Sequence, residues 1–81
     1  EQVLHNSVSI YPNPTDGEFA IKVATDNCTI EIYNIIGEVI LKRSEAPLHS
    51  HINLTNKVNG LYIVKVMHEG ILLGEQKIVK D

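Results

Sequence analysis

Four histidines are the side chains in this sequence that most readily suggest chemistry. His49 and His51 form a His-x-His pair, and an extended strand would place both on one face. Two imidazoles do not complete a zinc site, which needs a third or fourth ligand, and His5 and His68 lie far away in the sequence. We therefore expect solvent-exposed histidines at loop edges and no bound metal.

Catalysis by nucleophiles or paired acids has no better support. Ser44 or Ser50 can be combined on paper with a His and an Asp, but neither serine lies in a nucleophile elbow. Glu38 and Glu45 lack a spacing that indicates paired carboxylates, and no phosphate-binding glycine motif is present. A chain of 81 residues also has little material for both a core and a substrate cleft. The sequence predicts a non-catalytic domain without a cofactor.

Cys28 is the single cysteine, so no internal disulfide can form. Its place in a run of alternating apolar residues predicts a small core side chain and not a reactive thiol. The net charge of −3 and the lack of a basic stripe argue against a nucleic-acid partner. No apolar run approaches the ~20 residues of a transmembrane helix. No signal peptide is recognisable, and Glu1 is not an initiator Met, so we expect a piece of a longer precursor.

The elements that must position these side chains are short strands. At 43% hydrophobic residues the chain is expected to form one globular domain. Apolar residues recur with a period of two almost throughout, and helical periodicity is nearly absent. The last expected strand spans Glu75 to Lys80, and the longest one begins near Tyr62. The predicted core comprises Phe19, Ile21, Ile30, Ile32, Tyr62, Val64 and Val66.

Turn-forming residues separate these runs. Pro12 and Pro14 fix their backbone and lack N–H groups, so Tyr11–Pro14 is expected to be a stiff connector that leads into the Asp16-Gly17 turn. Asn34–Gly37 and Glu69-Gly70 are expected to form hairpin turns. The polar segment Ser44–Ser50 is expected to be an exposed loop. We predict positive φ for at least two of the four turn glycines, which are Gly17, Gly37, Gly60 and Gly70.

About seven short strands, spaced roughly 8–12 residues apart, predict an all-β fold: a small immunoglobulin-like antiparallel β-sandwich. Gly60 precedes Tyr62 at the start of the longest strand, which is typical of a tyrosine corner. In that arrangement the buried ring needs a hydrogen-bond partner for its hydroxyl, and a backbone group upstream provides it.

Three ordered segments resemble the type A C-terminal sorting domain of the type IX secretion system, the Por secretion family. The segments are Tyr11–Phe19, Ile30–Gly37 with Val39 behind it, and Gly60–Val66 with Lys77–Lys80 at the end. Ile52–Thr55 resembles a further family element, with Asn53 in place of the usual Asp and Thr55 in place of the usual Ser. The resemblance assigns the sorting motifs to Pro12, Asn13, Pro14, Asp16, Gly17, Asn34, Gly37, Gly60, Tyr62, Lys65, Lys77, Ile78, Val79 and Lys80.

The resemblance implies a signal domain behind an upstream cargo protein in the same precursor, with residues 1–7 as the end of a linker. It further implies recognition by the type IX outer-membrane translocon and, in many members, removal by a sortase-like peptidase. The cargo would pass through the periplasm of a Gram-negative bacterium to the cell surface or the medium. The rival functions are a carbohydrate- or protein-binding module and a structural spacer. The binding module would need an exposed aromatic platform, and the lack of Trp disfavours it.

The last strand is expected to contribute to recognition. A C-terminal strand on a sheet edge can pair with a strand of a partner. Lys77 and Lys80 flank Ile78-Val79, and lysines on an edge deter unwanted pairing. On this view deletion of Lys77–Asp81 would leave most of the core in place and abolish export.

Overall fold

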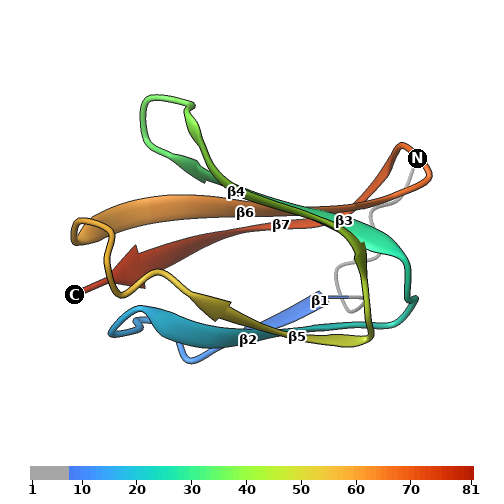
Figure 1. The fold of residues 1–81 in the computed structure, drawn as a ribbon, viewed down its shortest axis with the longest axis horizontal. Coiled ribbons are helices and arrows are strands. Elements are labelled where there is room, and N and C mark those ends of the chain that lie inside the picture. The colour runs from blue at the N-terminus through green and yellow to red at the C-terminus, as the bar shows by residue number, and fades with distance from the viewer. Residues whose placement is uncertain (1–7) are drawn as a thin grey trace.

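The computed structural model describes residues 8–81, which form seven strands in two sheets (Figure 1). The strands are β1 (Val8–Tyr11), β2 (Glu18–Val23), β3 (Cys28–Asn34), β4 (Val39–Ala46), β5 (His49–Asn53), β6 (Gly60–His68) and β7 (Ile71–Lys80). Every neighbouring pair is antiparallel. The predicted all-β sandwich is therefore confirmed, whereas the predicted linker, residues 1–7, lies outside the described residues.

The strand order is that of an immunoglobulin-like sandwich. One sheet has the order β1-β2-β5 and the other β4-β3-β6-β7. In an immunoglobulin constant domain the fourth strand joins the sheet of the first two. Here β4 instead pairs with β3, opposite the three-stranded sheet, so one sheet has four strands and the other three.

The core lies between the two sheets and is built from every second residue of the strands. All seven predicted core side chains are buried, and the most exposed of them, Tyr62, is 2% exposed. Cys28 is also fully buried, as predicted, and its thiol donates a hydrogen bond to the Thr25 carbonyl at 3.0 Å. Burial, together with the nearby charge of Asp26, raises the pKa of the Cys28 thiol, which disfavours the reactive thiolate.

Two boundaries predicted from the sequence are wrong. The last strand begins at Ile71 and not at Glu75. The predicted loop Ser44–Ser50 is largely strand, because β4 continues to Ala46 and β5 starts at His49. Ala46 and Ser50 are small, buried side chains that pair with Cys28 and Ile21. A segment that is polar in composition can therefore still supply the inward positions of two strands.

The expected turns are confirmed. All four turn glycines have positive φ, between +80° and +147°. In the β6–β7 hairpin Glu69 joins Gly70 in the left-handed region, with φ 51°. The peptide bonds Tyr11–Pro12 and Asn13–Pro14 are both cis.

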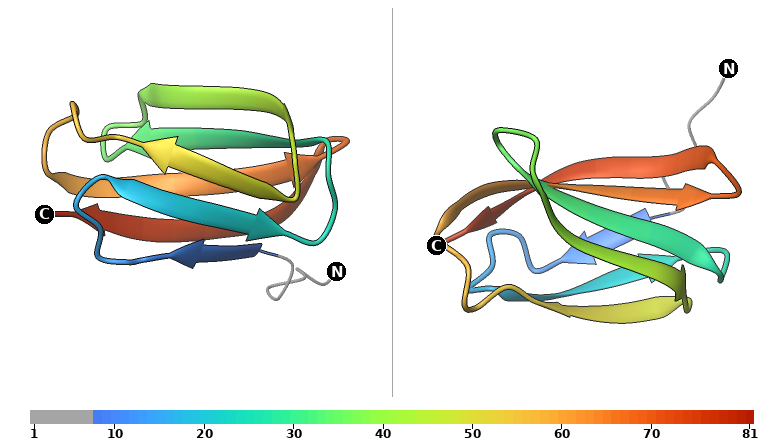
Figure 2. Two further views of the ribbon diagram at one scale, coloured as in Figure 1. Left: turned by 60° about the horizontal axis from the view of Figure 1, so that its bottom comes forward. Right: turned by 45° about the horizontal axis from the view of Figure 1, so that its top comes forward.

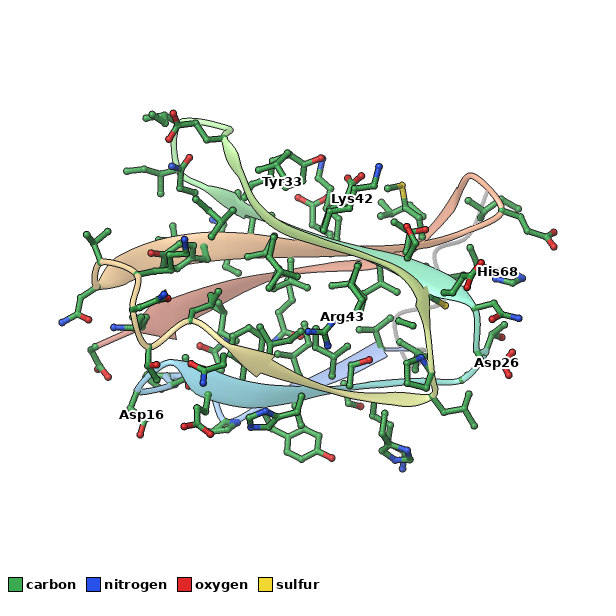
Figure 3. The ribbon with its side chains drawn as sticks, viewed as in Figure 1. Asp16, Asp26, Tyr33, Lys42, Arg43 and His68 are labelled. Atoms are coloured by element: carbon green, nitrogen blue, oxygen red, sulfur yellow. The ribbon has the colours of Figure 1, made fainter. Side chains whose placement is uncertain are left out.

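Two of the sheet edges are protected against pairing with another chain. The β3–β4 pairing contains two register shifts, and Glu45 in β4 has φ 55°. Such bulges make an edge strand a poor template for a further strand. On β5 the outward carbonyl of His51 accepts a hydrogen bond from Arg43 Nη1 at 3.2 Å, and Figure 3 shows Arg43 between the two sheets.

The connections fall at two opposite ends of the sandwich (Figures 1 and 2). The β1–β2, β3–β4 and β5–β6 connections and the C-terminus share one end, which we call the distal end. The remaining connections lie at the other end, the proximal end, where β1 begins. A domain joined to the preceding chain through β1 therefore points its distal end away from that chain.

Candidate functional site

Most of the residues that the sequence assigns to sorting motifs come together at the distal end. They are Pro12, Asn13, Pro14, Asp16 and Gly17 between β1 and β2, Asn34 and Gly37 between β3 and β4, Gly60 and Tyr62 at the start of β6, and Lys80 at the end of β7. The structure does not bring Lys65 to this end, since it lies midway along β6. Lys77, Ile78 and Val79 lie along β7 as it approaches the end.

The β1–β2 turn is hydrogen-bonded to the outer edge of β7. Asn13 Nδ2 donates to the Lys77 carbonyl at 2.9 Å, and Asn13 Oδ1 accepts from the Val79 amide at 3.0 Å. Thr15 N donates to the Val79 carbonyl at 2.8 Å, and Asp81 N donates to the Thr15 carbonyl at 2.9 Å. We call these four bonds the clasp. The side chain of Asn13 and the backbone of Thr15 together take the place of a neighbouring strand.

The clasp corrects two expectations about the last strand. β7 is an edge strand, as predicted, but its outer edge is occupied between Lys77 and Asp81 and is not free to pair with a partner's strand. Lys80 is also not an exposed lysine that deters pairing at this edge. It is 7% exposed, and its Nζ donates to Asn59 Oδ1 at 2.6 Å. Lys80 faces inward because it lies two residues after the buried Ile78, whereas Lys77 is exposed.

Thr15 joins the clasp to the β5–β6 connection, a role that no feature of the sequence indicates. Its side chain is buried, and Oγ1 donates to the Glu18 carbonyl at 2.7 Å and accepts from the Gly17 amide at 3.0 Å. The Gly17 carbonyl then accepts from the Leu54 amide at 2.7 Å. Three segments that are far apart in sequence are therefore held in one hydrogen-bonded unit.

The β3–β4 turn is fixed by the side chain of Asn34. Its Oδ1 accepts from the amides of Ile36 at 3.1 Å and Glu38 at 2.9 Å, and its Nδ2 donates to Glu38 Oε1 at 2.7 Å. Gly37 has φ 90° and donates to the Asn34 carbonyl at 3.1 Å. An asparagine at the start and a glycine at the end thus define this turn.

The β5–β6 connection is capped in a similar way. Asn53 Oδ1 accepts from the Thr55 amide at 2.9 Å and from Thr55 Oγ1 at 2.6 Å. Tyr62 O–H donates to the Val58 carbonyl at 2.6 Å, four residues upstream, while its ring is buried in the core. The predicted tyrosine corner is confirmed.

We expect Tyr62→Phe to lower the free energy of unfolding by about 0.5–1.5 kcal/mol, the usual net contribution of one hydrogen bond. The ring would keep its place in the core while the Val58 carbonyl loses its donor. Urea unfolding measures the loss, with Tyr11→Phe as the control because Tyr11 is half-exposed on the three-stranded sheet. Equal losses in the two variants would show that the hydroxyl of Tyr62 adds nothing to the corner.

Apolar side chains project from the distal end between these fixed turns. Ile35, Ile36 and Val58 are 71%, 75% and 81% exposed. Together with Asn34, Asn59, Gly60, Leu61 and Tyr62 they line a depression of about 270 Å³. Exposed apolar groups on a rigid frame are typical of a surface that contacts another macromolecule.

Within residues 8–81 no group of three or more His, Cys, Asp or Glu side chains could hold a metal ion. His49 and His51 are exposed on the outer face of the three-stranded sheet, where His51 Nε2 lies 3.2 Å from Glu18 Oε1, and His5 is outside the described residues. In the same part of the chain no helix is long and apolar enough to cross a membrane.

These features define a class of protein: a small immunoglobulin-like sandwich that presents ordered turns at one end. A family model described as the secretion system C-terminal sorting domain matches residues 9–81. The chain belongs to this family, the sorting domains of type IX secretion, whose members are non-catalytic signal domains. Membership implies a secreted protein and engagement with the secretion machinery. No curated protein matches the chain.

Proposed function

We propose that the distal end is the surface that the type IX outer-membrane translocon recognises. The domain then directs a cargo protein, located upstream in the same precursor, from the periplasm to the cell surface or the medium. A sortase-like peptidase removes the domain after transport. The observation that carries this proposal is the joining of the β1–β2 turn, the β5–β6 connection and the last residues of β7 by hydrogen bonds at one end.

The geometry of this end suits recognition. It lies opposite the start of β1, so cargo that precedes β1 would not cover it. The turns are held by side-chain hydrogen bonds of Asn13, Asn34 and Asn53, so little conformational entropy is lost when a partner binds. The exposed side chains of Ile35, Ile36 and Val58 supply apolar area for the contact.

The test compares two matched variants of the domain fused behind a reporter with a periplasmic signal, in a cell that has the type IX machinery. Ile36→Asp changes the distal end, and Ile71→Asp changes a similarly exposed isoleucine in the proximal hairpin. We expect export of the intact fusion, at least about a tenfold loss with Ile36→Asp, equivalent to about 1.4 kcal/mol of binding, and near-normal export with Ile71→Asp. Melting temperatures of both variants verify that each domain is folded.

Two failures have separate meanings. If the intact domain leaves the reporter in the periplasm, the sorting proposal fails and a spacer or binding module takes its place. If the intact domain exports the reporter and both variants do so equally well, the sorting role stands but the distal end is not the surface recognised.

A further inference from the structure

The outer face of the four-stranded sheet carries a row of charges whose signs alternate across all four strands. From β4 to β7 the residues are Lys42, Glu31, Lys65 and Glu75, each directly opposite the next. Glu31 points away from the core because Ile30 and Ile32 beside it are buried, and its cross-strand partners share its face. We call these four residues the charge row. Figure 3 shows Lys42 and Tyr33 on this side of the sheet.

Apolar cross-strand pairs flank the charge row on both sides. Tyr33 lies opposite Ile63 towards the distal end, and Met67 lies opposite Leu72 towards the proximal end. Leu72 is 38% exposed, and Tyr33 and Ile63 are half-buried. The outer face of the three-stranded sheet instead carries polar residues such as Ser9, Lys22 and His49. The two outer faces therefore differ in character.

We propose that the outer face of the four-stranded sheet binds the same face of a second copy of this chain, in a dimer with a twofold axis parallel to the strands. Such an axis reverses the strand order in the facing copy, so that β4 faces β7 and β3 faces β6. Lys42 then meets Glu75 of the second copy, and Glu31 meets Lys65. All four contacts of the charge row pair opposite signs, as an interface that contacts its own copy requires.

The charge row selects this axis over the alternative. A twofold axis in the same plane but perpendicular to the strands would place Lys42 on Lys42 and Glu31 on Glu31. Four alternating charges are therefore self-complementary in one orientation only. The same parallel axis also places Tyr33 against Ile63 of the second copy, so apolar contact accompanies the charge pairing.

The contacts within one copy predict a weak association that salt opposes. Glu31 already accepts a hydrogen bond from Tyr33 O–H at 2.6 Å and lies 3.8 Å from Lys42 Nζ. Lys65 Nζ lies 5.2 Å from the centre of the Tyr33 ring and forms no ion pair within residues 8–81. Four strands give a face about 19 Å wide and, over about six residues of each strand, about 20 Å long, which is an area of roughly 400 Å². This is about half of the roughly 800 Å² per partner that a stable interface buries. Exposed charge pairs are also screened by salt.

The parallel axis has a consequence for sorting. This consequence rests on the proposed function, whereas the dimer itself does not. Both copies point their distal ends the same way and begin their β1 strands at the opposite end. Two recognition surfaces would then lie side by side, and a machinery with more than one receptor would bind them with increased avidity.

Charge reversal tests the dimer. By sedimentation equilibrium at up to about 1 mM of the 81-residue chain in low salt, we expect Glu75→Lys and Lys42→Glu each to weaken association at least tenfold, because each puts like charges in contact twice. An equimolar mixture of the two variants restores association. Lys42 of the Glu75→Lys variant then meets Glu75 of the Lys42→Glu variant, and the two reversed charges, at positions 75 and 42, also attract each other. Lys22→Glu on the other sheet is the control and leaves association unchanged.

The proposal is overturned by a wild-type chain that stays monomeric at this concentration in low salt, by association that grows with salt, or by single variants that associate as wild type does. The double variant Lys42→Glu with Glu75→Lys provides a second measurement within one chain. Its row is again self-complementary, so it must associate more strongly than either single variant. Circular dichroism of all variants shows that they are folded; folded single variants that fail to associate on mixing would equally contradict the pairing.

Discussion

Deletion of Lys77–Asp81 is expected to unfold the domain, contrary to the view that the last strand can be removed without loss of the core. Ile78 in this segment has no exposed surface. Truncation of a buried isoleucine alone costs about 2–5 kcal/mol, and the four clasp bonds each contribute roughly 0.5–1.5 kcal/mol. Since small domains have only about 5–15 kcal/mol of stability, the deletion removes most or all of it.

Thermal and urea unfolding followed by circular dichroism measure this effect. The control is Lys77→Ala, which changes an exposed side chain in the same segment and keeps the backbone carbonyl that Asn13 uses. We expect a change of no more than about 0.5 kcal/mol for the control. A truncated domain that still unfolds cooperatively, within a few degrees of the intact one, would show that the clasp and Ile78 contribute far less than their burial and bonding indicate.

This expectation changes how deletion experiments on the C-terminus are interpreted. If the truncated domain is unfolded, lost export reports the loss of the fold and not the loss of an address. The last residues of β7 are joined to the β1–β2 turn, so their deletion also releases Asn13 and Thr15. Point variants of exposed distal residues, with proximal variants as controls, separate recognition from stability.

The sequence predicted those parts of the fold that depend on local patterns. Alternating apolar residues identified the core, because a strand turns every second side chain to the same face. Glycine, asparagine and proline marked the turns, since these residues favour backbone conformations that others disfavour. The partner of the Tyr62 hydroxyl was foreseeable because it lies four residues upstream in the chain.

The clasp was not predictable, because it joins groups more than 60 residues apart and depends on which strands become neighbours. Thr15 has no distinguishing sequence signal, and Lys80 was expected to lie exposed on the sheet edge because edge lysines deter unwanted pairing. Lys80 is buried because it lies two residues after Ile78 and so faces the same, inward side of the strand, and because Asn59 accepts a hydrogen bond from its Nζ. The charge row likewise needs the registers of three strand pairs, which no spacing in the sequence specifies.

Gly17→Ala is the second change for which we expect a large loss of stability. Gly17 has φ +128°, and a backbone in this region costs other residues about 1–3 kcal/mol. A Cβ at this position would also lie 2.9 Å from both Cα and Cγ2 of Thr55. Overpacking of this kind adds about 1–3 kcal/mol, so we expect a total loss of roughly 2–6 kcal/mol in urea unfolding.

Gly37→Ala and Gly70→Ala are the matched controls, because both glycines have positive φ but nothing within 4 Å of the added Cβ. Their losses should be limited to about 1–3 kcal/mol, the same cost of a positive-φ backbone that is assigned to Gly17. The difference between Gly17 and these controls therefore measures the contact between the β1–β2 turn and the β5–β6 connection. If the three variants lose equal stability, Thr55 moves aside at little cost, and the hydrogen bond from Leu54 to Gly17 does not hold the two segments rigidly together.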